Sequence, residues 1–327
     1  MTGISIKGLG KSVPSKVLTN EELSSFVDTS DEWIKTRTGI SSRHVATTET
    51  TTELAVNAAK EALEKSKVDK NDVKLIIVAT VTPDSTMPST ACKVANALGI
   101  EDAMCFDITA ACSGFVYATE IAINLMKGTN IQNSIVVGAE VLSKQLEWED
   151  RSTSVLFGDG AGAIVYSRSD KNSILSTLTG SKSSGVDQIV LQMPEGNRKF
   201  YKNQDYAKGI YMNGKGVYSF ATTVVPKTIV DVLDTVKLTP EDIDWYVLHQ
   251  ANSRIMDRVA KSLEVSCDKF FKNLDTHGNT SAASIPMALY DLQDSLRYGD
   301  KIIASGFGAG LTFGTMLIEW NTNKEVG

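Results

Sequence analysis

The sequence predicts an α/β fold in which one layered unit occurs twice. Apolar runs of strand length alternate with helix-like segments along the whole chain. In addition, "SVLFGDGAGAIVYS" (154–167) and "ASGFGAGLTFGTMLIEW" (304–320) each pass from a Phe-Gly turn into an apolar strand. Because the two halves close alike, we expect equivalent halves at 1–170 and 171–327.

In the first half, three short apolar runs read as buried strands, at 74–82, 103–108 and 133–143. Helices are expected between them, at 89–98 and 113–126. The second half repeats this order with a helix at 217–236, a strand at 244–250, helices at 252–263 and 282–296, and a strand at 300–307.

Matching the halves places Cys112 and Ser281 at equivalent helix starts. It also places His249 where Thr82 lies, at the C-terminal end of a strand, and ligands of α/β sheets gather at such ends. The segment 194–209 is too polar for a core, and we expect a surface excursion there.

Composition and charge exclude several classes of function. The chain has 327 residues and a net charge of −6, so no overall field favours nucleic acid or an anionic membrane. No apolar run reaches the roughly 18 residues of a membrane span, and the start lacks the apolar core of a signal peptide. The four cysteines and three histidines show no zinc-ligand spacing, so we expect a cytoplasmic protein without a metal.

"GDGAGA" (158–163) loosely fits a dinucleotide-binding fingerprint. Such a fingerprint follows a strand and opens a helix, whereas this segment precedes a strand. We therefore expect no nucleotide site here, and Asp159 is interpreted as a turn residue.

Four elements are candidates for chemistry: Cys112, His249 in "LHQAN", Asn279 in "HGNTSAAS", and the backbone of "GFGAG" (306–310). Each alone has a simpler interpretation. A free cysteine is often core filler, a lone histidine is often structural, and asparagine commonly caps a helix.

Together these elements indicate acyl chemistry. A thiol at a helix start has its thiolate stabilised by free N–H groups and the helix dipole, which predicts a lowered pKa for Cys112. His249 and Asn279 can both donate hydrogen bonds to one oxyanion, and the glycine-rich backbone can supply a second oxyanion hole. Two such sites around a thiolate suit thioester exchange followed by carbanion chemistry.

The whole chain resembles β-ketoacyl-[acyl carrier protein] synthase III, the condensing enzyme that starts fatty-acid synthesis. The matching stretches are "DTSDEWIKTRTGI" (28–40), "TPDSTMPSTAC" (82–92), "DITAACSGF" (107–115), "DRSTSVLFGDGAGA" (150–163), "LHQANSRI" (248–255), "HGNTSAASIPMAL" (277–289) and "SGFGAGLTFG" (305–314). This resemblance implies the thiolase fold, with five layers in the order α-β-α-β-α, and a Cys112-His249-Asn279 triad.

The resemblance also implies a two-stage decarboxylative Claisen condensation. Cys112 takes the acyl group from an acyl-CoA primer, and the backbone N–H groups of Cys112 and Ala309 hold the oxyanion. His249 and Asn279 then stabilise the enolate formed when malonyl-[acyl carrier protein] loses CO₂, and a 3-oxoacyl-[acyl carrier protein] leaves. No metal or redox cofactor is implied, because the CoA thioester is a substrate.

Three residues are implied in CoA binding: Trp33 and Arg37 beside the adenine and phosphates, and Arg151 at the nucleotide end. The alternative for Trp33 is a core aromatic beside a helix, and the two arginines could be plain surface charges.

The resemblance implies a homodimer in which "PDSTMPS" (83–89) brings Met87 to the partner's acyl pocket. Arg254, Arg258 and Lys261 have the spacing of one helical face and are implied in binding the acidic carrier protein. A solvent-exposed loop and a solvated helix face are the alternatives.

This sequence departs from the family pattern at His277, where tyrosine is common, and at Phe313, where tryptophan is common. With these two departures, the sequence does not determine the shape of the pocket, and it does not identify the primer. The rival functions are a related condensing enzyme of specialised, polyketide-type metabolism and a papain-like peptidase, whose C-G-[SA]-C-[WY] signature is absent. A catalytically inactive scaffold would not need all three triad residues.

Overall fold

A computed structural model describes residues 3–191 and 209–322 of the chain. Apart from its last residue, the polar segment expected as a surface excursion, 194–209, lies outside the described residues. Within the described ranges, no helix combines the length and the apolar character needed to cross a membrane.

The first large sheet has five strands in the order β1-β7-β6-β4-β5. β4 pairs in parallel with β5 and β6, whereas β7 is antiparallel to both β6 and β1. Its strands are β1 (Gly3–Ser12), β4 (Val73–Ala79), β5 (Met104–Ile108), β6 (Asn133–Glu140) and β7 (Gly160–Ser169).

The second large sheet repeats this plan in the order β11-β12-β13-β8. Its strands are β8 (Ile174–Ser181), β11 (Trp245–Leu248), β12 (Lys301–Gly308) and β13 (Thr312–Glu319). β11 and β12 are parallel, like β4 and β6, and β13 is antiparallel to β12, like β7 to β6. In place of a strand matching β5, a single parallel bridge joins Tyr246 to Phe270.

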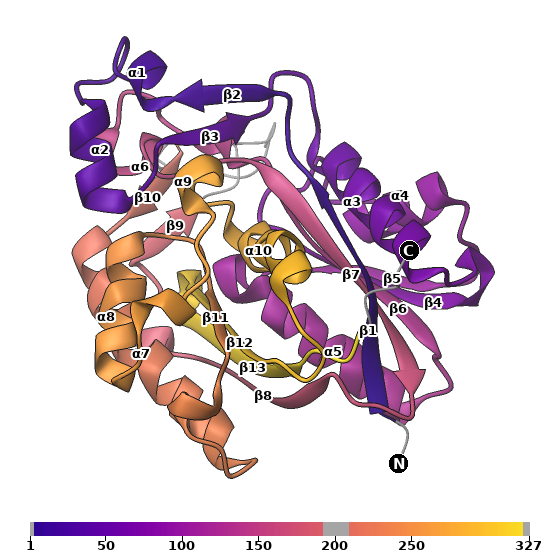
Figure 1. The fold of residues 1–327 in the computed structure, drawn as a ribbon. Helices are drawn as coiled ribbons and strands as arrows, with labels where there is room; N and C mark the ends of the chain where they lie inside the picture. The colour runs from indigo at the N-terminus through magenta and orange to yellow at the C-terminus, as the bar shows by residue number, and fades with distance from the viewer. Residues whose placement is uncertain (1–2, 192–208, 323–327) are drawn as a thin grey trace.

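Helices form three layers around the two sheets, as Figure 1 shows. α3 (Thr51–Ser66) and α4 (Thr90–Leu98) cover the outer face of the first sheet, and α7 (Gly214–Asp234) and α8 (Ser253–Leu263) lie outside the second. α5 (Gly114–Gly128) and α10 (Ser284–Leu292) lie between the sheets. The expected α-β-α-β-α layering is therefore confirmed.

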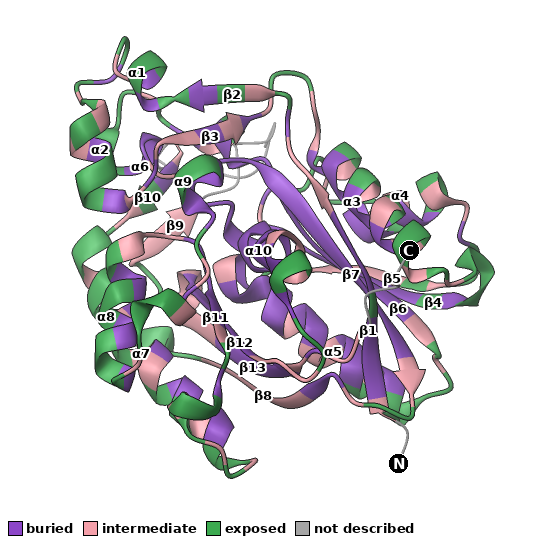
Figure 2. Ribbon diagram, viewed as in Figure 1, coloured by how far each residue is buried: buried purple, intermediate pink, exposed green. Residues whose placement is uncertain are grey.

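The largest hydrophobic core fills the space between the sheets, where burial is nearly continuous (Figure 2). Phe115 and Val116 of α5 and Ile285 and Leu289 of α10 belong to it and are buried. The apolar sequence of these two helices is explained by this position, because both sides of each helix contact a sheet.

Short elements surround one end of the layers. β2 (Lys16–Thr19) pairs with β3 (Ser42–Val45), and β9 (Ile189–Leu191) pairs with β10 (Ile210–Met212). The short helices are α1 (Asn20–Leu23), α2 (Asp31–Thr38), α6 (Arg151–Ser154) and α9 (Leu274–His277).

The helix starts of the two halves are equivalent, but the expected residue match is wrong by one position. Short 3₁₀ turns precede both central helices, at Ala111–Ser113 and Ser281–Ala283. Their first residues share a left-handed backbone, with φ of 45° at Ala111 and 48° at Ser281. Cys112 is therefore equivalent to Ala282, and Ser281 is equivalent to Ala111.

The match of His249 with Thr82 is also inexact. His249 follows β11 directly, whereas Thr80 and Val81 separate Thr82 from the end of β4. The expected strand at 133–143 likewise ends at Glu140, because the chain then turns into a 3₁₀ helix at Leu142–Gln145. The division into halves at residue 170 stays a prediction.

Candidate active site

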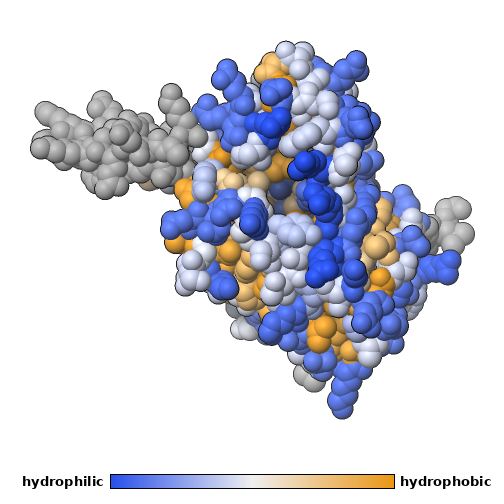
Figure 3. All heavy atoms as spheres, turned by 90° about the vertical axis from the view of Figure 1, so that its left-hand side faces the viewer, coloured by the Kyte–Doolittle hydropathy of each residue, from blue (hydrophilic) through white to orange (hydrophobic). Residues whose placement is uncertain are grey.

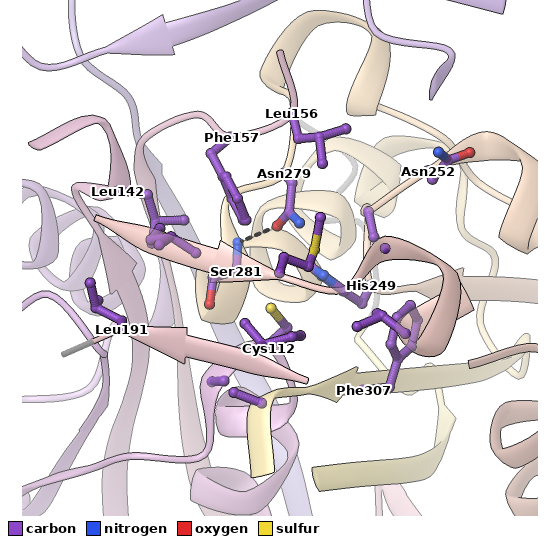
Figure 4. Close-up of a pocket in the computed structure, with 18 of the residues that line it drawn as sticks. Cys112, Leu142, Leu156, Phe157, Leu191, His249, Asn252, Asn279, Ser281 and Phe307 are labelled. Carbon is purple, nitrogen blue, oxygen red and sulfur yellow. Dashed lines mark hydrogen bonds between the residues drawn. The ribbon is translucent and has the colours of Figure 1, made fainter. Parts of the chain in front are cut away.

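Cys112 lies at the junction between β5 and α5, where the two sheets face each other. Ala111, in the left-handed region, reverses the chain just before it, and α5 begins two residues after it. Figure 4 shows its sulfur, His249 and Asn279 around one space. Three side chains that are distant in sequence are therefore brought together at one cavity, as predicted from the motifs.

The expected lowering of the Cys112 pKa is not found in the structure. Burial, with a smaller contribution from the charge of Glu140, raises the pKa of the Cys112 thiol to about 12. The hydrogen bond from Ser281 and the Cys112 backbone N–H favour the thiolate but do not offset burial. The resting thiol is neutral, and a proton must leave it before nucleophilic attack.

His249 sits at the end of β11, where its backbone N–H donates to the Ser305 carbonyl at 2.8 Å. Its Nδ1 is 2.7 Å from the Ser284 hydroxyl, and its ring makes an edge contact with Phe307. Burial lowers the pKa of His249 to about 3, so the imidazole is neutral. If the Ser284 hydroxyl donates to Nδ1, the N–H lies on Nε2, the other ring nitrogen.

Asn279 is held through both its backbone and its side chain. Its N–H donates to the Leu156 carbonyl at 2.8 Å, and its own carbonyl accepts from Gly158 at 3.0 Å. Its Oδ1 accepts the Ser281 N–H at 2.9 Å, the interaction dashed in Figure 4. Because the oxygen is occupied in this way, the NH₂ group is the part of the amide left for the cavity.

The glycine-rich turn at 308–310 packs directly on the nucleophile. A Cβ at Gly308 would lie 2.7 Å from the Cys112 nitrogen, so only glycine allows this approach. Ala309 follows and lines the cavity beside Cys112. This places two backbone segments where an oxyanion on a Cys112 adduct would form.

The triad opens into a largely apolar cavity of about 260 Å³. Its lining comes from both halves of the fold and includes Val81, Leu142, Phe157, Leu191, Met212 and Tyr218. In Figure 3, the surface that bears α8 is hollowed, with apolar residues inside and hydrophilic ones around the rim. Such a tunnel suits an apolar chain that ends in a reactive group.

The Trp33 ring contacts two cations near the rim of this cavity. The guanidinium carbons of Arg37 and Arg151 are 5.2 Å and 4.8 Å from the centre of its ring. Arg37 is tied to the rim because Asn252, which lines the cavity, donates to its carbonyl at 3.0 Å. Trp33 is half-buried and packs against the core cluster beneath α7 and α8, so both readings of it agree with its position, and an aromatic-cationic surface adjoins the tunnel.

The three basic residues of α8 are all exposed, and none makes an ion pair within the part of the chain that the structure describes. Asp257, on the same helix, is instead paired with Lys272 at 2.8 Å. α8 starts at the cavity rim, because its N-cap Asn252 and Ile255 both line the cavity. Arg254, Arg258 and Lys261 therefore extend away from the tunnel mouth.

Comparison with known proteins identifies the family to which this site belongs. Residues 106–183 match the family model described as 3-oxoacyl-[acyl-carrier-protein (ACP)] synthase III, and residues 233–320 match its C-terminal model. A beta-ketoacyl-[acyl-carrier-protein] synthase III of Clostridium botulinum (strain Loch Maree / Type A3) is 46% identical over 98% of this chain and all of the relative. The chain belongs to the 3-oxoacyl-[acyl-carrier-protein] synthase III family.

Solved structures agree with this assignment. The synthase III of Aquifex aeolicus VF5 has a TM-score of 0.90 and 42% identity, covering 97% of this chain and all of that one. The priming beta-ketosynthase of the R1128 polyketide biosynthetic pathway has a TM-score of 0.92 but 31% identity, covering 98% of this chain and 97% of that one. The resemblance seen in the sequence is thus confirmed, and the chain is a condensing acyltransferase of the synthase III type.

The two departures from the family pattern lie outside the tunnel. His277 is 3.3 Å from Asp291 and close to His44, and Phe313 packs near Phe220. Neither residue lines the cavity around Cys112. Their effect on its shape is therefore indirect.

Three polar residues of this synthase III site were missed by sequence reasoning. Ser284 contacts His249, Ser281 lines the cavity together with Cys112, and Glu140 is buried at the end of β6. Both serines stand in "GNTSAAS", but their spacing alone does not show which neighbour each faces. Glu140, in "VVGAEVL", gave no signal, because an acidic residue after an apolar strand usually reads as a solvated strand end.

Proposed function

We propose that this chain catalyses the decarboxylative condensation of an acyl-CoA primer with malonyl-[acyl carrier protein]. The product is a 3-oxoacyl-[acyl carrier protein], and the reaction initiates fatty-acid synthesis. The observation that carries this proposal is the convergence of Cys112, His249 and Asn279 at the end of one apolar tunnel in a chain of the synthase III family.

In the first stage, the acyl thioester reaches Cys112 through the tunnel, with the CoA nucleotide on Trp33, Arg37 and Arg151. The Trp33 indole can stack on an aromatic base, and the two guanidinium groups beside it can bind phosphates. The Cys112 thiolate attacks the carbonyl carbon while the N–H groups of Cys112 and Ala309 stabilise the oxyanion. The carbon–sulfur bond to CoA then breaks and leaves acyl-Cys112.

In the second stage, malonyl-[acyl carrier protein] enters the same tunnel. As CO₂ leaves, negative charge develops on the thioester oxygen, where the Asn279 NH₂ and the His249 Nε2–H can donate hydrogen bonds. A neutral imidazole suits this donor role, because the pKa of His249 is held far below neutrality by burial. The enolate carbon attacks acyl-Cys112, and the 3-oxoacyl product leaves on the carrier. No metal or redox cofactor is needed for these steps, and this remains an expectation.

We further propose that the enzyme is a homodimer that works in the cytoplasm. Met87 is 83% exposed in the single chain, and Met104 on the edge strand β5 is 50% exposed, which supports an apolar contact with a second copy there. All four cysteines are free thiols, as a reducing compartment would keep them.

A role in polyketide-type metabolism is the second candidate. It is supported by the likeness to the R1128 priming ketosynthase, at 31% identity. The 46% identity to a synthase III over the whole chain favours the first candidate.

The decisive experiment is intact-protein mass spectrometry after incubation with acetyl-, isobutyryl- and longer acyl-CoAs. We expect a mass increase of one acyl group on the wild type and none on Cys112→Ala. Cys92→Ala, Cys105→Ala and Cys267→Ala are matched controls that should still load. Loading that survives in Cys112→Ala would contradict the proposed nucleophile, and a second assay with malonyl-[acyl carrier protein] tests the condensation.

A further inference from the structure

A fully buried arginine lies beside the loop that carries Asn279, and it has no acidic partner among the residues that the structure describes. Arg43, in β3, is 0% exposed. Its guanidinium donates to uncharged groups: the Val155 carbonyl at 2.8 Å, the Asn20 amide oxygen at 2.9 Å and the Leu18 carbonyl at 3.4 Å. Removing a charge from water without an opposite charge nearby is unfavourable. Such an arginine is therefore expected where its hydrogen bonds have a function that an apolar side chain cannot supply.

The Val155 carbonyl belongs to the backbone segment with which Asn279 pairs. Val155 caps α6, and the Leu156 carbonyl directly after it accepts the Asn279 N–H at 2.8 Å. The Asn279 carbonyl in turn accepts the Gly158 N–H at 3.0 Å, so Phe157 and Asn279 form a parallel bridge. Leu156, Phe157 and Asn279 all line the catalytic cavity, as Figure 4 shows. One hydrogen bond thus connects the guanidinium to the short backbone pairing that places the Asn279 amide.

The stem of Arg43 packs against both sides of this pairing. A Cβ on Gly158 would lie 3.0 Å from the Arg43 Cβ, and a Cβ on Gly278 would lie 3.2 Å from it. Gly278 also has a φ of 65°, which residues with a side chain rarely adopt. Because Gly278 directly precedes Asn279, the arginine stem supports the paired backbone at the point where the catalytic loop begins.

The segment 155–159 is held by β3 at both of its ends. At one end, the His44 carbonyl accepts the Asp159 N–H at 2.9 Å, a backbone contact that does not depend on the type of side chain. At the other end, the contact needs a long side chain with a donor at its tip. In Arg43, Nη2 binds the Val155 carbonyl while Nη1 is fixed by Asn20. A rigid fork with two separate donors can make both contacts at once, which the single ammonium of lysine cannot do in the same geometry.

We propose that Arg43 is a positioning residue for Asn279 in the enolate step. The guanidinium fixes the segment 155–158, and the backbone pairing fixes Asn279 in turn, so that its NH₂ group points at the place where the enolate oxygen forms. Arg43 does not itself belong to the described lining of the cavity, so it acts only through Asn279. This inference rests on the proposed role of Asn279 in condensation.

The test uses Arg43→Met, which keeps an unbranched stem and loses every donor, and Arg43→Lys, which keeps the charge but loses the fork. Displacing a donor can slow the reaction at most as much as deleting it. We therefore expect kcat for malonyl decarboxylation to fall about 10-fold in Arg43→Met, which is less than the fall in Asn279→Ala. Arg43→Lys should lie between Arg43→Met and the wild type. The KM for malonyl-[acyl carrier protein] and acyl loading at saturating acyl-CoA should be nearly unchanged, because the cavity lining at Cys112 is kept.

A double-mutant cycle separates positioning from general support of the fold. If Arg43 acts through Asn279, Arg43→Met should cause no further loss of decarboxylation when residue 279 is already alanine. In the His249→Ala background the same change should still slow the step as it does in the wild type, because His249 is held by Ser284 instead. A loss of equal size in all three backgrounds would overturn the proposal. If Arg43→Met proves insoluble, the same cycle is measured with Arg43→Lys.

Hydrogen exchange followed by mass spectrometry gives a readout that does not depend on activity. Peptides that contain the Asn279 and Gly158 amides should exchange faster in both Arg43 variants, because these N–H groups form the pairing. Peptides from β6 and α5 should exchange as in the wild type. Unchanged exchange at Asn279 and Gly158 would overturn the proposal even if activity fell. Faster exchange with normal decarboxylation would support the positioning and contradict the proposed catalytic role of Asn279 instead.

The matched control is Arg168→Met, because Arg168 also binds backbone carbonyls. It donates to Ile131 at 3.1 Å and to Met126 and Thr129, at the end of α5 opposite to Cys112. We expect Arg168→Met to unfold at a lower urea concentration than the wild type while both half-reactions keep their rates. A fall in decarboxylation equal to that of Arg43→Met would overturn the proposal, since any destabilising loss of an arginine would then produce it.

Discussion

The proposed role of His249 and Asn279 follows from the hydrogen bonds that fix their side chains. Asn279 has its oxygen bound to the Ser281 N–H, and His249 has one ring nitrogen bound to Ser284. Each therefore has a nitrogen left to face the space above Cys112. Removing either donor should affect the enolate step more than acyl transfer.

We therefore predict that His249→Ala and Asn279→Ala slow malonyl decarboxylation by roughly 10²–10³-fold, the usual effect of losing one oxyanion donor. Acyl loading should fall much less. Release of labelled CO₂ from malonyl-[acyl carrier protein] and acyl loading are measured on the same preparations. Unchanged decarboxylation would show that these side chains do not contact the enolate.

Burial of His249 also links stability to pH. Its pKa is lowered from 6.5 to about 3, so between these values the unfolded chain binds a proton that the folded protein does not. Stability must then decrease as the pH falls below about 6.5. By linkage, this residue alone should remove about 2 kcal/mol between pH 7 and pH 5.

Urea unfolding of wild type and His249→Gln at both pH values measures the contribution of His249 to this loss of stability. Glu140 acts in the opposite direction, because its pKa is raised, so only the difference between the two proteins is informative. An identical loss in both proteins would mean that His249 is not responsible.

At the scale of elements, α8 presents cations next to the tunnel that form no ion pair with any residue the structure describes. Arg254→Glu should weaken the malonyl-carrier half-reaction several-fold and leave loading from acyl-CoA nearly unchanged, because the first step needs no carrier. Lys60→Glu on α3 is a control with the same charge change on an exposed residue of the opposite outer layer. The carrier KM should also rise with salt, since exposed charges are screened over roughly 8–10 Å.

A loss of equal size in both half-reactions would instead place Arg254 in CoA binding or in the fold. The two half-reactions are therefore measured at the same ionic strength.

The loop at 83–89 tests the proposed dimer. If Met87 reaches the acyl tunnel of a second copy, Met87→Trp should shift primer preference toward short acyl groups. Competition among acyl-CoAs of different length, together with the mass of the assembly by analytical ultracentrifugation, checks both parts. An unaltered chain-length profile in a dimer would place Met87 elsewhere.

Much of the element order was predictable from sequence, because buried strands and the two central helices are continuous apolar runs. The boundaries of the elements were less predictable where a turn depends on tertiary contacts. The strand expected to reach residue 143 stops at Glu140, whose carboxylate binds the end of β4. In the second half, the strand equivalent to β5 is reduced to a single bridge at Phe270. Hydrophobic periodicity in the sequence cannot predict this reduction.

At the scale of the whole molecule, the meeting of Cys112, His249 and Asn279 in one cavity was predictable because their motifs are specific to the family. The network behind it was not. The place of Ser281 in the cavity lining beside Cys112 depends on a left-handed backbone, and the burial of Glu140 depends on the packing of β6 against the start of the opposite central helix. Both facts arise only when the two halves are assembled.

That assembly has a consequence for how the enzyme can change over time. A Cβ on Gly138 would lie 2.1 Å from the Ala282 carbonyl oxygen, and one on Gly306 would lie 2.7 Å from that of Cys112. The two contacts occupy equivalent positions in the two halves of the fold. A saturation library scored for soluble expression should therefore accept no substitution at either Gly138 or Gly306. Gly128, which has nothing within 4 Å of such a Cβ, should tolerate many. The positions that tolerate no substitution would then show that the two halves descend from one ancestral half, even where their sequences have diverged.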